Sequence, residues 1–165
     1  MKHLLLTLSL LLLTICCKAQ ETKATPHVTF SGIEVKGDIF EFADSLKQHG
    51  FSLQKRIGRD WMYIFKGNVY GANCYFQVSY TKNTRSVYRI IAETNRIDVA
   101  SYIETLVGIY GPNYQVNPNS YQWMVPGGAV MLMVPEGRDP KLVIVDEQGY
   151  MLFKDEQDLY ENQLD

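Results

Sequence analysis

Apolar side chains recur at helical spacing in two stretches of the chain. In residues 98–111 they begin after Asp98, which suits the N-terminal cap of a helix, and they end at Gly111-Pro112, a strong helix stop. In residues 38–50, Asp38 suits the N-terminal cap and Gly50 the stop of a second helix. The apolar stripes are Val99, Tyr102, Ile103, Leu106 and Tyr110 in one, and Ile39, Phe42, Ala43 and Leu46 in the other. The pattern therefore predicts two amphipathic helices.

After each predicted helix come three runs with the period-two pattern of strands. These runs are residues 61–66, 73–81 and 87–95 in the first half and 121–125, 129–135 and 141–147 in the second. Residues 27–36 read as an extra N-terminal strand with a bulge at Ser31-Gly32, and residues 150–153 as a short edge strand. Residues 51–56 could be a strand or an extended linker, and residues 113–120 read as a polar loop.

The order of these elements predicts an α+β domain over residues 27–153, in which one unit of a helix and three antiparallel strands is used twice. The half-repeats would be residues 27–95 and 96–153, and both helices would cover the same face of the sheet, because each carries one apolar stripe. Poor residue identity between the halves leaves open a chance likeness between two parts of one α+β chain. Residues 154–165 are polar and acidic and read as a solvated tail or a frayed helix.

The N-terminus has the pattern of a secretory signal peptide. A short basic leader precedes the apolar run from Leu4 to Ile15. Cys17 and Ala19 then place small residues at the third and the last position before the predicted cleavage site. The sequence predicts cleavage between Ala19 and Gln20, a flexible spacer over residues 20–26, and a periplasmic or secreted product with no transmembrane span. An uncleaved anchor and a lipoprotein are the alternatives. Lipidation at Cys16 or Cys17 is disfavoured, because neither follows a small residue suited to it.

Charge and cysteine content narrow the function classes. The full chain has a net charge of −2. Cleavage would remove Lys2 and Lys18 and make it more acidic, so nothing attracts nucleic acid. Only Cys74 would remain of the three cysteines, so a monomer could form no internal disulfide.

The phrases Phe30-Ser31-Gly32-Ile33 with Gly37 before the first helix, and Tyr110-Gly111-Pro112 at the end of the second, resemble those of many small exported bacterial proteins of unknown function. The element order is similar to that of the β-lactamase-inhibitor-protein-like fold. This resemblance implies an open concave sheet face that binds a partner protein. The inhibitors proper carry disulfides that a lone Cys74 cannot form, so the resemblance extends to architecture and not to inhibition.

The sequence offers little for catalysis. Cys74 could act as a nucleophile with His27 or His49 as its base, but its strand parity makes it a core residue. Asp38 and Asp98 are better explained as helix caps than as paired acids. Scattered histidines argue against a metal site, and no glycine-rich loop opens a helix, so we expect no enzyme activity, no metal and no cofactor.

Aromatic and polar side chains on the strands are the remaining candidates. Tyr75, Gln77 and Arg89 project from the strand faces opposite the better apolar set, so on a sheet covered on one side they would form an open mixed patch. An ordinary exposed sheet surface would look the same in sequence. We therefore predict a non-catalytic domain that binds an envelope or secreted protein through this face. The alternative is a small-ligand or glycan binder, which would require a concave pocket lined by aromatic side chains.

Overall fold

The computed structural model describes residues 27–95 and 97–161. The predicted signal peptide, spacer and last residues of the tail lie outside the described residues. The helices are α2 (Ile39–Gln48), α3 (Val99–Tyr110) and α4 (Glu147–Glu161), with a 3₁₀ turn, η1, at Gly58–Asp60. The strands are β1 (Thr29–Phe30), β2 (Ile33–Glu34), β3 (Ser52–Ile57), β4 (Met62–Val69), β5 (Ala72–Tyr80), β6 (Val87–Glu93), β7 (Gln115–Asn117), β8 (Ser120–Val125), β9 (Gly128–Met133) and β10 (Lys141–Asp146).

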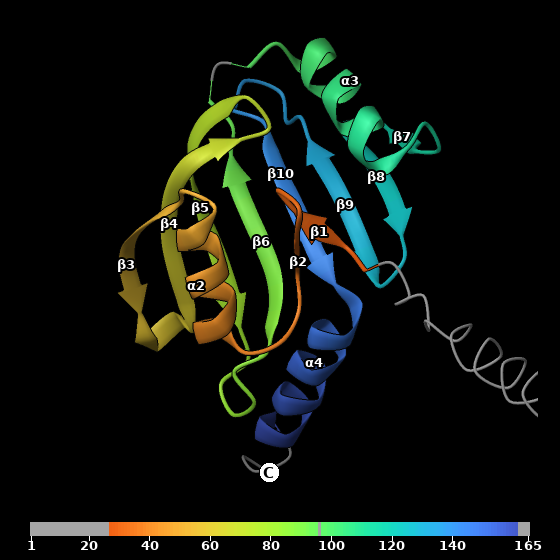
Figure 1. The fold of residues 1–165 in the computed structure, drawn as a ribbon. Coiled ribbons are helices and arrows are strands. Elements are labelled where there is room, and N and C mark those ends of the chain that lie inside the picture. Colours follow the sequence, from red (N-terminus) through yellow and green to blue (C-terminus); the bar gives the residue numbers. More distant parts are fainter. Residues whose placement is uncertain (1–26, 96, 162–165) are drawn as a thin grey trace, which may run out of the picture.

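Eight strands form one antiparallel sheet in the order β3-β4-β5-β6-β10-β9-β8-β7 (Figure 1). The first half of the chain supplies β3–β6 and the second supplies β7–β10, and the halves join where β6 pairs with β10. The α+β class predicted from the sequence is confirmed. Each half has four strands after its helix instead of three, because residues 52–57 and part of the predicted loop at residues 113–120 pair as edge strands.

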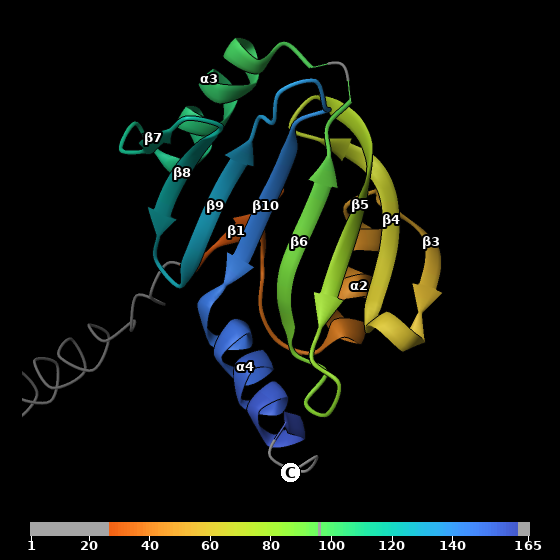
Figure 2. The ribbon, with the colours of Figure 1, turned by 180° about the vertical axis from the view of Figure 1, so that it is seen from behind.

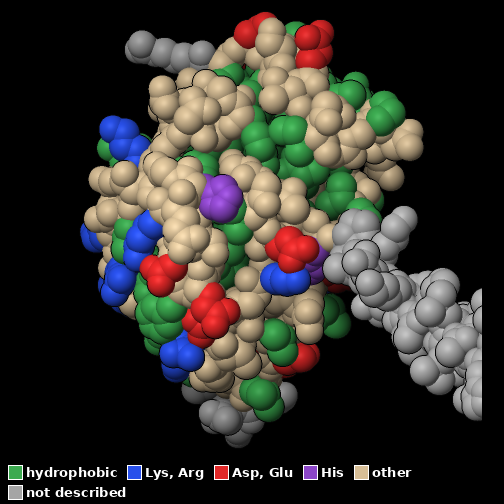
Figure 3. All heavy atoms as spheres, in the orientation of Figure 1, with side chains coloured by type: hydrophobic (Ala, Val, Ile, Leu, Met, Phe, Trp, Pro, Cys, Tyr) green, Lys and Arg blue, Asp and Glu red, His purple; other side chains and the backbone are tan. Residues whose placement is uncertain are grey.

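One face of the sheet carries the core. The inward residues of β4, β5, β6, β8, β9 and β10 form a single apolar cluster with α2 and α3, through residues such as Phe42, Leu46, Tyr102 and Leu106. The predicted apolar stripes are therefore the buried ones, and both helices pack on the same face. Figure 3 shows this helix-covered side, where hydrophobic side chains gather towards α3 and charged ones surround α2.

The N-terminal segment forms a hairpin of its own. Ser31 and Gly32 both have positive φ, 50° and 81°, as the two-residue turn between β1 and β2 requires. The predicted bulge at Ser31-Gly32 is therefore wrong, because the change of side-chain parity there marks a reversal of the chain. This hairpin does not join the large sheet but packs on its core face through Phe30 and Val35.

A chain of tyrosine hydroxyls fixes the hairpin to the second helix. Tyr110, at the end of α3, donates to the Thr29 carbonyl at 2.8 Å, and its oxygen lies 2.7 Å from the Tyr70 hydroxyl. Tyr70 in turn accepts from the backbone N–H of Ser31 at 2.8 Å. Burial raises the pKa of both tyrosines, so both remain neutral donors. The two phrases around Ser31 and Tyr110 thus meet in space and are explained by structure.

The third helix was predicted only in part, as one of two alternatives for residues 154–165. The expected edge strand at residues 150–153 is wrong, because α4 begins at Glu147 and continues to Glu161. Gly149, which reads as a turn signal, instead permits close packing, since a Cβ there would lie 2.2 Å from the Val87 carbonyl oxygen. The Asp146 carboxylate accepts from the Gly149 N–H at 2.6 Å and begins the helix as a cap.

Candidate functional site

The side of the sheet opposite α2 and α3 forms a broad exposed surface, which we call the open face. Strand register places one continuous row across it: Lys55, Ile64, Gln77, Ile91, Val143, Met131, Gln122 and Gln115. Within the described residues no helix lies over the middle of this side (Figure 2). Tyr75 and Met124, which flank the row, are 54% and 65% exposed. The open face is therefore mixed, with apolar side chains accessible at its surface.

The three residues predicted as a patch do lie on this face. Tyr75 and Gln77 are two residues apart on β5, and Arg89 sits on β6, where it pairs with Ser79. The Lys66 ammonium lies 5.5 Å from the Tyr75 ring centre, and the Arg89 guanidinium carbon lies 5.5 Å from the Tyr88 ring centre. The Arg89 Nε is buried and has no hydrogen-bond partner among the described residues.

Tyr75 and Gln77 also border a hollow of about 490 Å³. Gln54, Lys55, Ile64 and Glu93 complete its lining, so it spans the first half of the sheet from β3 to β6. Sequence alternation found two of its six lining residues. Alternation could not place Gln54 or Lys55 on this face, because the pairing of β3 with β4 shifts register between Leu53 and Lys55.

The open face is basic although the chain as a whole is acidic. Lys55, Lys66, Arg89 and Lys141 project from it, against the single carboxylate of Glu93 on the paired strands β3–β6 and β10. Glu93 is itself engaged by Lys141 Nζ at 3.0 Å. The remaining cations, Lys55 on β3, Lys66 on β4 and Arg89 on β6, have no ion-pair partner among the described residues. They therefore place positive charge beside the apolar side chains of the row.

A second concave region lies between α4 and the end of the sheet at the β5–β6 hairpin, and we call it the α4 cleft. Its volume is about 640 Å³. It is lined by Asp60, Trp61, Tyr80, Lys82, Asn83, Tyr88, Phe153, Glu156, Gln157, Leu159, Tyr160 and Glu161. No residue of it was predicted as a site. The abundance of tyrosine was a signal, but its use depended on recognising that residues 147–161 are a helix.

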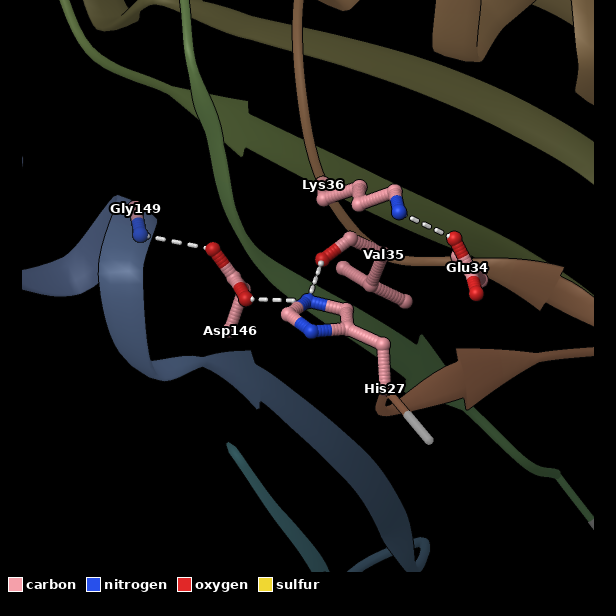
Figure 4. A network of polar contacts seen from close by, with 6 residues as sticks. All are labelled: His27, Glu34, Val35, Lys36, Asp146 and Gly149. Carbon is pink, nitrogen blue, oxygen red and sulfur yellow. Dashed lines mark hydrogen bonds and ion pairs between the residues drawn. The ribbon is translucent and has the colours of Figure 1, made fainter. Parts of the chain in front are cut away.

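A buried acid–imidazole contact fastens the N-terminal hairpin beside this cleft. His27 Nε2 lies 2.6 Å from Asp146 Oδ1 and 3.1 Å from the Val35 carbonyl oxygen (Figure 4). Both partners accept, so Nε2 carries a proton and donates. Asp146 is only 2% exposed and its other oxygen caps α4, so one carboxylate ties β1–β2, β10 and α4 together. No local pattern links Asp146 to His27, which lies 119 positions away in the sequence.

The remaining chemical candidates have structural roles. Asp38 and Asp98 cap α2 and α3, accepting from Phe40 N and Ala100 N. Burial raises the pKa of the Cys74 thiol to about 11, so it is a neutral core side chain at ordinary pH. The His49 Nδ1 lies 2.8 Å from the Ser45 carbonyl oxygen at the end of α2. Across the described residues, no group of three or more metal-ligating side chains is close enough to hold an ion.

No protein-family model, curated protein or solved structure matches this chain. In the part of the chain that the structure describes, no helix is both long enough and apolar enough to cross a membrane. Any functional assignment therefore depends on the open face and the α4 cleft themselves.

Proposed function

We propose that this chain is an exported, non-catalytic binding domain that docks on another protein through its open face. The observation that carries the proposal is the apolar row, from Ile91 on β6 through Val143 on β10 to Met131 on β9, at the centre of an exposed sheet surface. Exposed apolar area with a polar and charged rim is typical of protein interaction sites. The pattern at residues 1–19 supports export.

The charges favour an acidic partner. Lys55, Lys66 and Arg89 lie on the half of the face that also holds Tyr75 and Gln77. A partner with an apolar side chain for the row and carboxylates facing these three cations would match both features. Tyr and Arg are also the residue types that most often dominate interface energies. The proposed partner is therefore an envelope or secreted protein with an acidic, partly apolar surface.

A site-specific crosslink tests the docking face. A photoreactive benzophenone side chain at position 75 would lie on the open face beside the row, and one at position 151 would lie on α4, where Met151 is 56% exposed. In cell-envelope extracts, we expect position 75 to yield a discrete crosslinked protein that position 151 does not. Equal labelling from both positions, or no crosslink from either, would contradict the proposal.

Charge and shape variants sharpen this test. Met124→Glu places a carboxylate on the open face, where it would repel an acidic partner, and Met151→Glu makes the same change on α4 with similar exposure. Only the first should abolish the position-75 crosslink. Raised salt should also lower the yield of the position-75 crosslink in the wild type, because charges separated by more than about 10 Å are screened near 0.1 M salt.

The alternative function from the sequence, a small-ligand or glycan binder, requires an aromatic-lined concave pocket. The α4 cleft fits this requirement better than the open face does, because five of its twelve lining residues are aromatic. A ligand that raises the melting temperature, with no protein crosslinked at position 75, would favour this alternative.

A further inference from the structure

The α4 cleft is assembled from three separate segments. The end of the 3₁₀ turn and the residue after it supply Asp60 and Trp61, and α4 supplies the residues from Phe153 onwards. The β5–β6 hairpin supplies Tyr80, Lys82, Asn83 and Tyr88. Its volume of about 640 Å³ lies within the usual range for small-ligand pockets, about 300–1,000 Å³. The cleft and the open-face hollow share no lining residue, so they are separate sites.

Fixed contacts shape the cleft without a ligand. Phe153 of α4 stacks on Tyr88, with ring centres 4.4 Å apart and planes 15° apart. The Glu156 carboxylate accepts from the backbone N–H groups of Asn83 at 3.1 Å and Thr84 at 3.0 Å. These contacts hold α4 against the hairpin, so the aromatic rings are pre-positioned and little ordering would be needed on binding.

Trp61 occupies a backbone conformation that its side chain disfavours. Its φ is 47°, in the left-handed region, where a bulky residue is an outlier that costs about 1–3 kcal/mol. Its indole meets Tyr80 edge to face at 6.1 Å yet remains 37% exposed at the cleft. Glycine would fit this backbone without strain. A strained tryptophan with part of its ring uncovered at the cleft points to a role for the ring itself.

The polar groups select the class of ligand. Asp60, Glu156 and Glu161 are the acids of the lining and Lys82 is its one base, so an anion would be repelled. Lys82 Nζ lies 5.9 Å from the Trp61 ring centre. Asn83 and Gln157 add amide groups that both donate and accept. A ligand with an apolar face for the indole and several neutral hydroxyl groups at its edge suits this combination.

We propose that the α4 cleft binds a neutral pyranose sugar, whose C–H face stacks on Trp61 and whose hydroxyl groups bond to Asp60 and Gln157. A sugar ring has the same division into apolar face and polar edge that the lining has. The site is distinct from the docking face, so its failure would leave the proposed function standing, and the reverse also holds.

Intrinsic fluorescence gives a direct readout, because the chain has two tryptophans and Trp123 is fully buried in the core. Titration with cellotetraose, maltotetraose and chitotetraose, each up to about 10 mM, should shift or quench the Trp61 emission for at least one sugar. Calorimetry with the responding sugar should give a matching dissociation constant. No response to any of the three sugars would overturn the proposal.

Variants separate binding from folding. Trp61→Gly relieves the backbone strain, which offsets part of the lost contact with Tyr80, so it should still fold and melt cooperatively, yet lose about tenfold or more in calorimetric affinity. Gln157→Ala keeps the indole and should also weaken binding. Phe40→Ala removes an exposed aromatic ring from α2 and should leave binding unchanged. Full affinity in Trp61→Gly, or a fluorescence response to tetramethylammonium but to no sugar, would contradict the assignment.

Discussion

The open face and the α4 cleft are built in different ways. Every residue of the open face lies on a strand, and its neighbours follow from strand register alone. The cleft joins residues up to about a hundred positions apart, such as Trp61 and Tyr160, through a helix packed on the end of the sheet. The first surface is broad and suits a protein, whereas the second is concave and suits a small ligand. The two proposed binding sites thus use separate parts of one fold.

The largest expected effect separates the two regions through Asp146. Asp146→Ala removes the cap of α4 and leaves His27 without its buried partner, so we expect a loss of about 3 kcal/mol in the free energy of unfolding. The loosened α4 should also weaken sugar binding in the cleft, while the position-75 crosslink persists. Urea denaturation measures the first effect.

Asp98→Ala is the matched control, because Asp98 caps α3 from an exposed position without a second buried contact. It should cost about 1 kcal/mol. Equal losses for the two variants would show that the His27 contact adds nothing to the cap.

An intermediate effect distinguishes the two sides of β5. Tyr75 is exposed, whereas its neighbour Cys74 is buried with a pKa raised from 9.0 to about 11. The folded state therefore favours the neutral thiol, and this stabilisation is complete below pH 9 and is lost as pH rises from 9 towards 11. Tyr70, Tyr102 and Tyr110, whose pKa values burial also raises, should add to the loss at higher pH.

Two measurements check this prediction. Urea midpoints should fall between pH 9 and pH 11, and Cys74→Ala should flatten the lower part of that fall. In the folded protein at pH 8, an aromatic disulfide reagent should react with Cys74 only at the rate of unfolding. Rapid labelling of the native protein would mean that the thiol is accessible.

The smallest effect on stability is expected on the open face itself. Met124→Glu, proposed above as a docking variant, should change the free energy of unfolding by no more than about 0.5 kcal/mol, because Met124 is mostly exposed. A thermal melt of Met124→Glu beside Met151→Glu checks this. A large loss would show that the open face is packed against part of the protein and is not free to dock.

Prediction from sequence succeeded where the signal was local. The caps at Asp38 and Asp98 and the alternation that places Tyr75, Gln77 and Arg89 on one side depend on residues only a few positions apart. It failed where a local signal had a distant cause. Gly149 resembles a turn residue, but it is small because Val87 packs against it, and the Ser31-Gly32 parity change resembled a bulge because a two-residue hairpin gives the same pattern.

The sequence by itself determined the class of fold, the faces of the two main helices and the side of the sheet on which the candidate docking residues lie, because hydrophobic periodicity encodes which side of an element is buried. Tertiary structure alone decided that residues 147–161 form a helix, that His27 meets Asp146, and that Trp61 stands beside Tyr80 and α4. These contacts depend on packing between distant segments, which no local pattern of residues specifies.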